Sequence, residues 1–202
     1  MLHFSDNSAN VGGDRLYKIR HIIDNLRTSF QGAFSPYRDV VIDESLLLYK
    51  GRLSFKQYIP SKRTRFGVKT FVMCDCSTGY ILDFIVYTGV NSVITVSGLG
   101  KRVDTVSTLL MPYLEKGLRL YVDNWYTSPE LFMWLHGQAT NACGTLRKTR
   151  KHLPEIDEKL KKGEISSKSA SSLLAMKWYD KREVWMLTTC HNSDMVTTGK
   201  KD

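Results

Sequence analysis

The sequence predicts an α/β fold in which a mixed β-sheet is flanked by helices and followed by a lobe with a β-hairpin. Apolar runs bounded by turn residues at 38–52, 66–76 and 79–89 are typical of strands. Segments 14–30 and 98–117 space their apolar residues as amphipathic helices do. Because strands and helices alternate along the chain, a sheet with helices on its faces accounts best for the pattern.

The first half of the chain contains one helix and three strands that are close in sequence. Proline disfavours helix at the residue before it, so Ser35–Pro36 ends the first helix. The strands at 38–52, 66–76 and 79–89 are near enough to one another to pair antiparallel. A second helix follows at 98–117, and Gly117 is well placed to end it.

The next segment contains a strand, a helix and a second strand. The strand at 118–122 is reached through a helix, as a parallel neighbour would be. Ser128 and Pro129 have the residue types of an N-cap and a first helical position, so a third helix begins there. The segment 141–147 then supplies one more short strand.

The last part of the chain differs in composition from the segments before it. Residues 148–172 are polar and rich in lysine, with little apolar periodicity. Two strand-like runs follow at 173–180 and 183–190, and the short turn between them predicts a hairpin within an insertion lobe. The tail at 191–202 is polar and adds no closing element. We therefore expect the α/β fold to be incomplete at its C-terminal end.

The composition indicates a basic globular protein. Twenty-nine Lys and Arg residues against 20 Asp and Glu residues give a formal charge of +9, which makes a polyanion a reasonable partner. The N-terminus lacks the basic and apolar regions of a secretory signal. No apolar run reaches the roughly 18 residues that predict a membrane span, so we expect no membrane association.

The four cysteines do not have the spacing of a disulfide framework or a zinc site. Cys74 and Cys76 form a C-x-C pair within a predicted strand, whereas Cys143 and Cys190 stand alone. Zinc sites usually need paired clusters of closely spaced ligands. We therefore expect reduced cysteines in an intracellular protein.

Two aspartates interrupt or follow predicted strands. Asp123, with Asn124, comes directly after the apolar strand 118–122, and Asp43 lies within the apolar run 40–48. An Asp-Asn pair by itself is most often a turn former, because both side chains bond to nearby backbone groups. An ionised carboxylate within a sheet, however, costs several kcal/mol unless a cation or hydrogen-bond donors compensate it.

A divalent metal ion would account for both acids. Mg²⁺ takes one or two protein carboxylates and completes its shell with water and phosphate oxygens. Two such ions about 4 Å apart can hold the attacking and leaving oxygens of a phosphodiester. We therefore expect Asp43 and Asp123 to converge at neighbouring strand tips, where one divalent cation touches both.

Basic residues form two clusters. The first lies between Ser45 and Cys74, contains no acidic residue and is interleaved with Phe55, Tyr58 and Phe66. Charge runs are usually solvated faces, but a cluster of one sign beside an acidic strand favours a nucleic-acid backbone bound across it. The residues that we predict to bind DNA are Arg52, Lys56, Lys62, Arg63, Arg65, Lys69, Arg147, Lys148, Arg150 and Lys151.

Several motifs occur in the order in which the piggyBac transposase family has them. Residues 40–75 contain I-D-E-x-L, G-R, Y-I-P-x-K and F-G-x-K, and residues 120–132 contain D-N-W-Y-T-S. The likeness continues through GTLRKTRKHLPE and KWYDKREVWMLTT, so it covers nearly the whole chain. The sequence thus resembles the piggyBac transposases, including their domesticated, transposable-element-derived members.

This resemblance implies an RNase H-like transposase core with an insertion between its second and third catalytic acids. The implied division is a helical lead-in at 1–35, the core at 36–146 and an insertion lobe with a polar tail at 147–202. The implied reaction is cut-and-paste DNA transposition, with strand nicking, hairpin formation at the element ends and joining to TTAA targets.

The resemblance also assigns roles and partners. It makes Asp43 the first catalytic aspartate and Asp123 the second, with both acids as metal ligands. The implied cofactor is Mg²⁺ or Mn²⁺, and the implied partner is double-stranded DNA. The family pattern also allows a homodimer and implies the nucleus as the location.

The sequence departs from the family at the third catalytic aspartate, which belongs to a segment resembling G-x-V-D-x-x-D-Q. That segment is not found, and Asp194 and Asp202 do not match it. The family's long N-terminal region and C-terminal cysteine-rich zinc module are not seen either, so the chain reads as cut at both ends. We therefore expect metal binding to be weak or absent and this chain alone not to cleave DNA.

Two other functions remain open on the sequence. One is a domesticated transposase-derived protein that binds DNA or chromatin without catalysis, which the missing third acid favours. The other is a basic interaction module that contacts protein alone.

Overall fold

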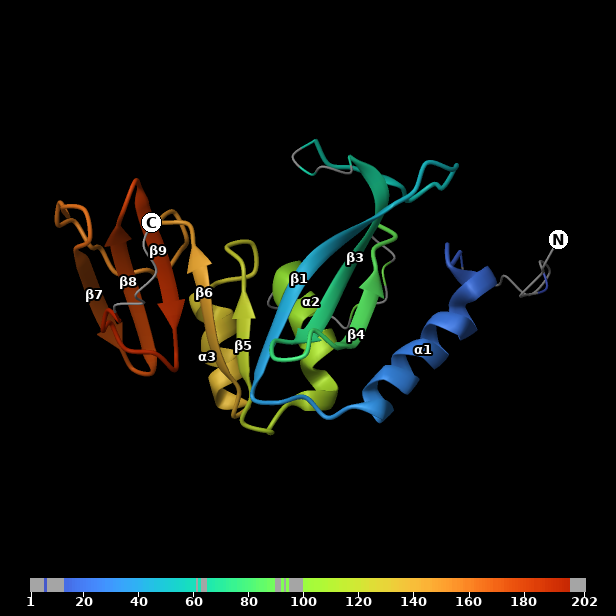
Figure 1. The fold of residues 1–202 in the computed structure, drawn as a ribbon, viewed down its shortest axis with the longest axis horizontal. Helices are drawn as coiled ribbons and strands as arrows, with labels where there is room; N and C mark the ends of the chain where they lie inside the picture. Colours follow the sequence, from blue (N-terminus) through green and yellow to red (C-terminus); the bar gives the residue numbers. More distant parts are fainter. Residues whose placement is uncertain are drawn as a thin grey trace. The chain divides into compact units, whose positions relative to one another are not determined.

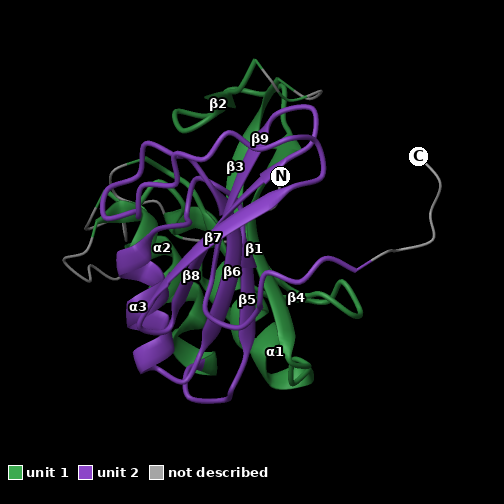
Figure 2. Cartoon of the chain, turned by 90° about the vertical axis from the view of Figure 1, so that its left-hand side faces the viewer, with its two compact units in different colours: residues 1–113 green, residues 114–202 purple. Residues whose placement is uncertain are grey.

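The computed structural model describes residues 6, 13–60, 62, 65–89, 92, 94 and 100–196. It divides into two compact units, residues 1–113 and residues 114–202 (Figure 2). Both units contain strands and helices, which confirms the predicted α/β class. The boundaries predicted after residues 35 and 146 stay predictions.

Unit 1 begins with a helix and then builds a small sheet (Figure 1). Its elements in chain order are η2 (Tyr17–Ile19), α1 (Arg20–Ala33), β1 (Asp39–Leu48), β2 (Gln57–Tyr58), β3 (Phe66–Asp75), β4 (Ile81–Val86), α2 (Lys101–Leu110) and η3 (Met111–Tyr113). The three main strands lie within their predicted segments, the helix at the start overlaps its predicted segment, and the second helix begins within its own.

The sheet of unit 1 is antiparallel and centres on β3. β1 pairs along one edge of β3, with Asp43 opposite Val72. β4 and the short β2 pair along the other edge of β3, at different levels. The predicted antiparallel pairing of the three main strands is therefore confirmed. β2 is not predicted from the sequence, because two residues are too few to show an apolar alternation.

Helix α1 is held on the sheet by apolar packing and by one buried ion pair. Phe30 packs against Phe84 of β4, with ring centroids 6.1 Å apart. Arg27 donates two hydrogen bonds to the fully buried carboxylate of Asp83, at 2.6 and 2.8 Å, and Gln31 donates a third. The hydrogen bond with Asp83 raises the pKa of Arg27 further above its ordinary value, although burial opposes the shift.

The turn between β3 and β4 is closed by a second buried aspartate. Asp75 accepts backbone N–H groups from Tyr37, Ser77 and Thr78 and the hydroxyl of Thr78. Burial raises the pKa of Asp75, but these hydrogen bonds outweigh burial and hold the pKa below its ordinary value. This turn lies between the two strands that the sequence predicts at 66–76 and 79–89.

The second helix ends earlier than predicted. α2 ends at Leu110 and tightens into the 3₁₀ turn η3, and the chain reaches Gly117 only after another left-handed residue, Glu115. Pro112 explains the early end, because it has no N–H with which to continue the α-helical ladder. The role predicted for Gly117 was therefore wrong.

In the described part of the chain, no helix has the length and apolar character that a membrane crossing requires.

Unit 2 combines one parallel and several antiparallel strand pairs. Its elements are β5 (Arg119–Val122), α3 (Pro129–Gly137), β6 (Asn141–Leu146), β7 (Ile165–Ala170), β8 (Leu173–Tyr179) and β9 (Glu183–Thr188). β5 and β6 are parallel and are joined through α3. β9 pairs antiparallel with β6, and β8 and β7 continue the sheet in that order.

Two local predictions are confirmed in unit 2, and one strand was missed. The Ser128 side chain caps α3 by accepting the N–H of Leu131, and Pro129 is the first helical residue. The hairpin predicted over 173–190 is formed by β8 and β9. The missed strand is β7, because its sequence ISSKSA has no apolar alternation and it pairs through its backbone with β8.

Candidate functional site

Asp43 is an exposed residue in the middle of a strand. It is the fifth of the ten residues of β1, and its Oδ1 accepts the N–H of Glu44 at 2.7 Å. The expected position at a strand tip was therefore wrong for Asp43, because β1 continues to Leu48 along β3. Its carboxylate nonetheless meets solvent, while Val40 and Ile42 of the same strand are fully buried.

Glu44, the other acid of this strand, is engaged in ion pairs. Its carboxylate lies 2.5 Å from Lys69 Nζ and 4.0 Å from Lys62 Nζ. Lys69 also lies over the rings of Phe71 and Tyr87. Two of the predicted DNA-binding lysines therefore balance the charge of Glu44 within unit 1.

Asp123 lies at the end of β5, as predicted, and it is exposed. Its Oδ1 accepts the N–H of Trp125 at 2.9 Å, and its carbonyl accepts both the N–H and the hydroxyl of Thr127. The residue thus forms the turn that the simpler interpretation of Asp-Asn predicts. The same turn fixes the Asp123 carboxylate at the end of the strand.

A glycine beneath this turn permits its close packing. Gly144 of β6 pairs with Val122. A Cβ atom at this position would lie 2.3 Å from Thr127 Oγ1 and 2.5 Å from the Val122 carbonyl oxygen. Thr127 is itself fully buried. The turn that carries Asp123 therefore requires a residue without a side chain at position 144.

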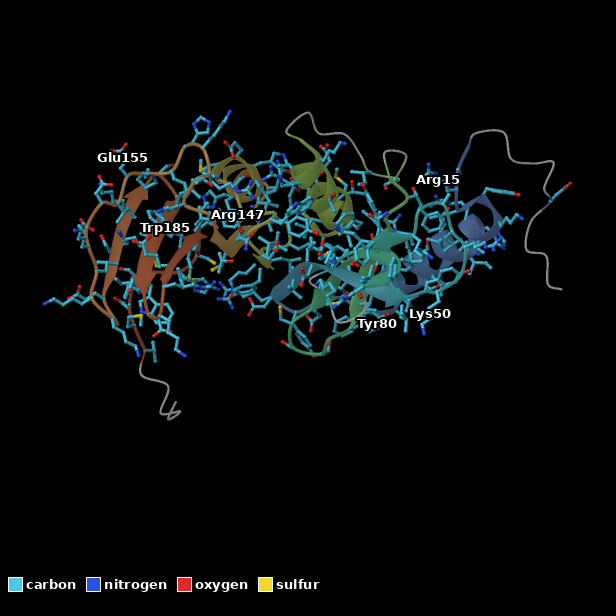
Figure 3. The ribbon with its side chains drawn as sticks, turned by 90° about the horizontal axis from the view of Figure 1, so that it is seen from above. Arg15, Lys50, Tyr80, Arg147, Glu155 and Trp185 are labelled. Atoms are coloured by element: carbon cyan, nitrogen blue, oxygen red, sulfur yellow. The ribbon has the colours of Figure 1, made fainter. Side chains whose placement is uncertain are left out.

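The second basic cluster comprises Arg147, Lys148, Arg150 and Lys151, and its two arginines support the same loop. Arg150 Nη2 donates to the carbonyls of Asn124 and Trp125 at 2.7 and 2.8 Å. Arg147, labelled in Figure 3, donates to the Asn124 side chain at 3.4 Å. Both residues were predicted as DNA contacts from charge alone. Their role in holding the loop after Asp123 was missed, because no local sequence signal links 124 to 150.

The remaining predicted DNA-binding side chains differ in whether other groups of the protein already contact them. Lys56 donates to the Gly51 carbonyl at 3.0 Å and lies over the ring of Phe66. The side chains exposed to solvent are Arg52, Lys62, Arg65, Lys148 and Lys151. Arg63 lies outside the described residues.

Sequence reasoning also missed a buried lysine. Lys177 of β8 is 3% exposed, and its Nζ donates to the carbonyls of Ile156 and Glu158 at 2.9 and 2.6 Å. It also lies 3.7 Å from the Glu183 carboxylate. Lys177 therefore ties the polar segment after β6 to the sheet. Its position inside the apolar run LLAMKWY was the signal that could have revealed it.

The two aspartates suit a hard cation by their chemistry. Both present exposed carboxylates, and Mg²⁺ accepts one or two protein carboxylates with water in its other positions. Asp43 belongs to unit 1 and Asp123 to unit 2. Their convergence, and their roles as ligands, therefore stay predictions. Within the described ranges, no three His, Cys, Asp or Glu residues gather closely enough to hold a metal ion.

Comparison with known proteins identifies relatives over most of the chain. The family described as Transposase IS4 matches residues 1–201. PiggyBac transposable element-derived protein 3 of Homo sapiens is 30% identical over 168 residues, which cover 81% of this chain and 28% of that protein. The chimeric ERCC6-PGBD3 protein of Homo sapiens is also 30% identical over 168 residues, covering 81% of this chain and 16% of that protein. The matches thus span less than a third of each of these relatives.

A solved structure has the same fold. It is the cryo-EM structure of a piggyBac transposase synaptic complex with hairpin DNA, and it matches with a TM-score of 0.88 and 25% sequence identity. The match covers 98% of this chain and 43% of that one. It agrees with the mixed sheet and flanking helices of an RNase H-like core. The chain therefore belongs to the Transposase IS4 family and is a transposase-derived domain of the piggyBac type.

Proposed function

We propose that this chain is the catalytic domain of a piggyBac-type DNA transposase, that it binds double-stranded DNA, and that Asp43 and Asp123 are its first two catalytic acids. The geometry of the Asp123 turn supports this proposal most strongly. The Trp125 N–H fixes the exposed Asp123 carboxylate at the end of β5, and Thr127 bonds to the Asp123 carbonyl. Two arginines hold the loop that follows. A likeness to a transposase solved with hairpin DNA supports the same function.

The proposed cofactor of the complete family site is Mg²⁺ or Mn²⁺, with Asp43 and Asp123 among its ligands and with weak or absent binding by this chain alone. When bound, such an ion supplies Lewis-acid chemistry to a phosphodiester. The contribution of the chain is to orient two carboxylates. The Asp123 turn restricts one of them through the Trp125 N–H, and the pairing of β1 with β3 restricts the backbone of the other. We also propose a nuclear location and a homodimer.

We propose that the exposed basic side chains make the principal phosphate contacts. Arg52 and Arg65 belong to the first cluster, and Lys148 and Lys151 belong to the second. Lys69 and Arg150 are expected to contribute less to DNA affinity, because the fold already uses their donors. Lys56, Lys62 and Arg147 are expected to make an intermediate contribution to DNA affinity. Arg63 is the last residue of the proposed set.

We further propose that the 202-residue chain does not cleave DNA by itself. Within the described residues, no third acid gathers with Asp43 or with Asp123 into a group that could hold a metal ion. Asp194 lies beyond β9, where its carboxylate accepts a hydrogen bond from Asn192. The second candidate is a domesticated DNA- or chromatin-binding protein without catalysis.

The salt dependence of duplex binding tests the proposed DNA interface. The logarithm of the binding constant should fall linearly with the logarithm of salt concentration, with a slope of about −0.9 for each phosphate neutralised. Replacing Arg52, Arg65, Lys148 and Lys151 together with Gln should make the slope shallower by about 3 to 4. Fluorescence anisotropy with a labelled blunt duplex measures the slope.

A matched variant controls for net charge. Replacing Lys159, Lys161, Lys181 and Arg182 with Gln removes the same number of charges from other exposed positions. We expect it to leave the slope nearly unchanged. Equal losses in the two variants would contradict a defined interface. Robust Mg²⁺-dependent nicking of the duplex by the unmodified chain would contradict the proposed lack of cleavage.

The acids separate the two candidate functions in the same assay. Replacing Asp43 and Asp123 with Asn removes negative charge, so binding without metal should stay the same or tighten. If the acids hold a metal ion at the interface, the double variant should also lose any tightening of binding by Mg²⁺, whereas Mg²⁺ still competes as a counterion. A tightening by Mg²⁺ that survives the substitutions would contradict the catalytic-domain proposal and favour the DNA-binding derivative.

A further inference from the structure

The outer ends of β1 and β3, with β2, form a projection that we call the basic arm. It comprises the described residues of the range 46–69. β4 pairs with β3 only from Thr70 onward, whereas β1 and β2 pair with β3 out to Gly67 and Phe66. Figure 1 shows β1 and β3 extending past the end of β4, and Figure 2 labels β2 at the same end of unit 1.

The basic arm is anchored to the core of unit 1. Phe55 is 6% exposed and joins a buried cluster with Leu16 and Ile23. Gly67 lets β3 approach β1 closely, because a Cβ atom there would lie 2.2 Å from the Leu47 carbonyl oxygen. One of the three aromatic residues interleaved with the basic cluster is thus a core residue that fixes the arm.

The other two aromatic residues face solvent as a pair. Tyr58 is 54% exposed and Phe66 is 48% exposed. They lie opposite each other on β2 and β3, with ring centroids 4.7 Å apart and planes inclined by 32°. Lys56 Nζ lies 5.7 Å from the centre of the Phe66 ring. The arm therefore offers aromatic surface to a ligand, with a cation beside it.

The charged side chains of the arm itself are all basic, and Lys62 also pairs with Glu44 of β1. The sequence contains no acidic residue between Ser45 and Cys74. Lys50, Arg52, Lys62 and Arg65 are exposed on the arm. Lys50 lies at the periphery of unit 1 in Figure 3. This charge matches a phosphate backbone and opposes docking of another basic surface.

We propose that the basic arm binds single-stranded DNA, with unpaired bases stacking on Tyr58 and Phe66 and phosphates held by the surrounding basic residues. Bases in a duplex already stack on one another, whereas an unpaired base offers its face to an aromatic ring. Exposed rings and clustered cations are the two features of sequence-tolerant single-strand binding. This inference rests on the proposed function, since it names a further DNA structure that the same basic cluster contacts.

Two leucine variants test the stacking directly. Tyr58→Leu and Phe66→Leu keep an apolar cross-strand contact between β2 and β3 but remove the aromatic face. Each should lower affinity for a labelled dT oligonucleotide about fivefold or more, while affinity for a blunt duplex changes less than twofold. Anisotropy titrations at fixed salt measure both affinities, and thermal unfolding confirms that each variant is folded.

Two further variants sharpen the test. Tyr58→Phe retains the aromatic face and should bind the oligonucleotide as the unmodified chain does. Tyr37→Leu changes an exposed aromatic residue outside the arm and should have no effect. A 2-aminopurine base placed in the oligonucleotide should change its fluorescence when the unmodified chain binds. It should not change with the variant that carries both Tyr58→Leu and Phe66→Leu.

The outcomes separate this inference from the proposed function. If the leucine variants bind the oligonucleotide normally while salt-dependent duplex binding persists, the stacking inference is wrong and the proposed function stands. If the unmodified chain does not bind the duplex, the proposed function fails whatever the oligonucleotide does. A loss of self-association in the leucine variants, with unchanged DNA binding, would assign the arm to a protein contact and overturn the inference.

Discussion

Replacing Asp83 with Ala is expected to lower the free energy of unfolding by roughly 3–5 kcal/mol, as removal of one partner of a buried ion pair does. The carboxylate is fully buried and accepts hydrogen bonds from Arg27 and Gln31 of α1. Without it, the largely buried guanidinium of Arg27 loses its counter-charge. Urea unfolding followed by circular dichroism measures the change.

A second Asp–Arg pair provides the control. Asp14 and Arg20 form an ion pair at 2.8 Å, but both side chains are partly exposed. Because exposed pairs contribute about 0–1 kcal/mol, Asp14→Ala should cost far less than Asp83→Ala. Similar losses in the two variants would show that the Asp83 pair does not hold α1 on the sheet.

Replacing Gly144 with Ala is expected to cost about 3 kcal/mol, at the upper end of the usual range for overpacking. The added methyl group would meet the Val122 carbonyl oxygen and the hydroxyl of buried Thr127. Neither can retreat without moving the backbone that carries Asp123. The variant should therefore lose stability together with any metal or DNA effect that depends on Asp123. Chemical unfolding and the duplex assay measure the two consequences.

A glycine on the neighbouring helix is the matched control. Gly137 ends α3, and a Cβ atom there would meet nothing within 4 Å. Because Ala is favoured over Gly in helices, Gly137→Ala should leave the stability unchanged or raise it by up to about 1 kcal/mol. A Gly144→Ala variant that is as stable as Gly137→Ala would contradict the tight turn described beneath Asp123.

The sequence predicted the long elements because their apolar periodicity is set by burial. It missed β7, whose exposed strand forms through backbone pairing with β8 and needs no apolar alternation. It also placed the end of α2 at Gly117, although Pro112 ends the α-helical ladder first. In both cases, backbone hydrogen bonding decided the outcome rather than side-chain burial: β7 gains backbone bonds to β8, and Pro112 has no N–H to donate.

The aspartates show a similar limit to what the sequence predicts about the candidate site. The cost of burying a carboxylate singled out Asp43, yet Asp43 is exposed. The argument applies instead to Asp75 and Asp83, which are fully buried. Donors distant in sequence hold Asp83, and Asp75 accepts from distant Tyr37 as well as from nearby Ser77 and Thr78. Arg150 likewise supports the Asp123 loop from a position that no local pattern connects to it. The sequence pattern indicated which residues are candidates, but only the fold shows which groups they contact.

Binding of one divalent cation by both Asp43 and Asp123 is most directly tested by Mn²⁺ titration followed by electron paramagnetic resonance. The samples are the unmodified chain, Asp43→Asn, Asp123→Asn and the double variant. If both carboxylates hold the same ion, each single substitution should remove the site as completely as the double substitution, because the effects of coupled residues do not add. Independent, additive losses, or a site that survives either single substitution, would contradict the shared site.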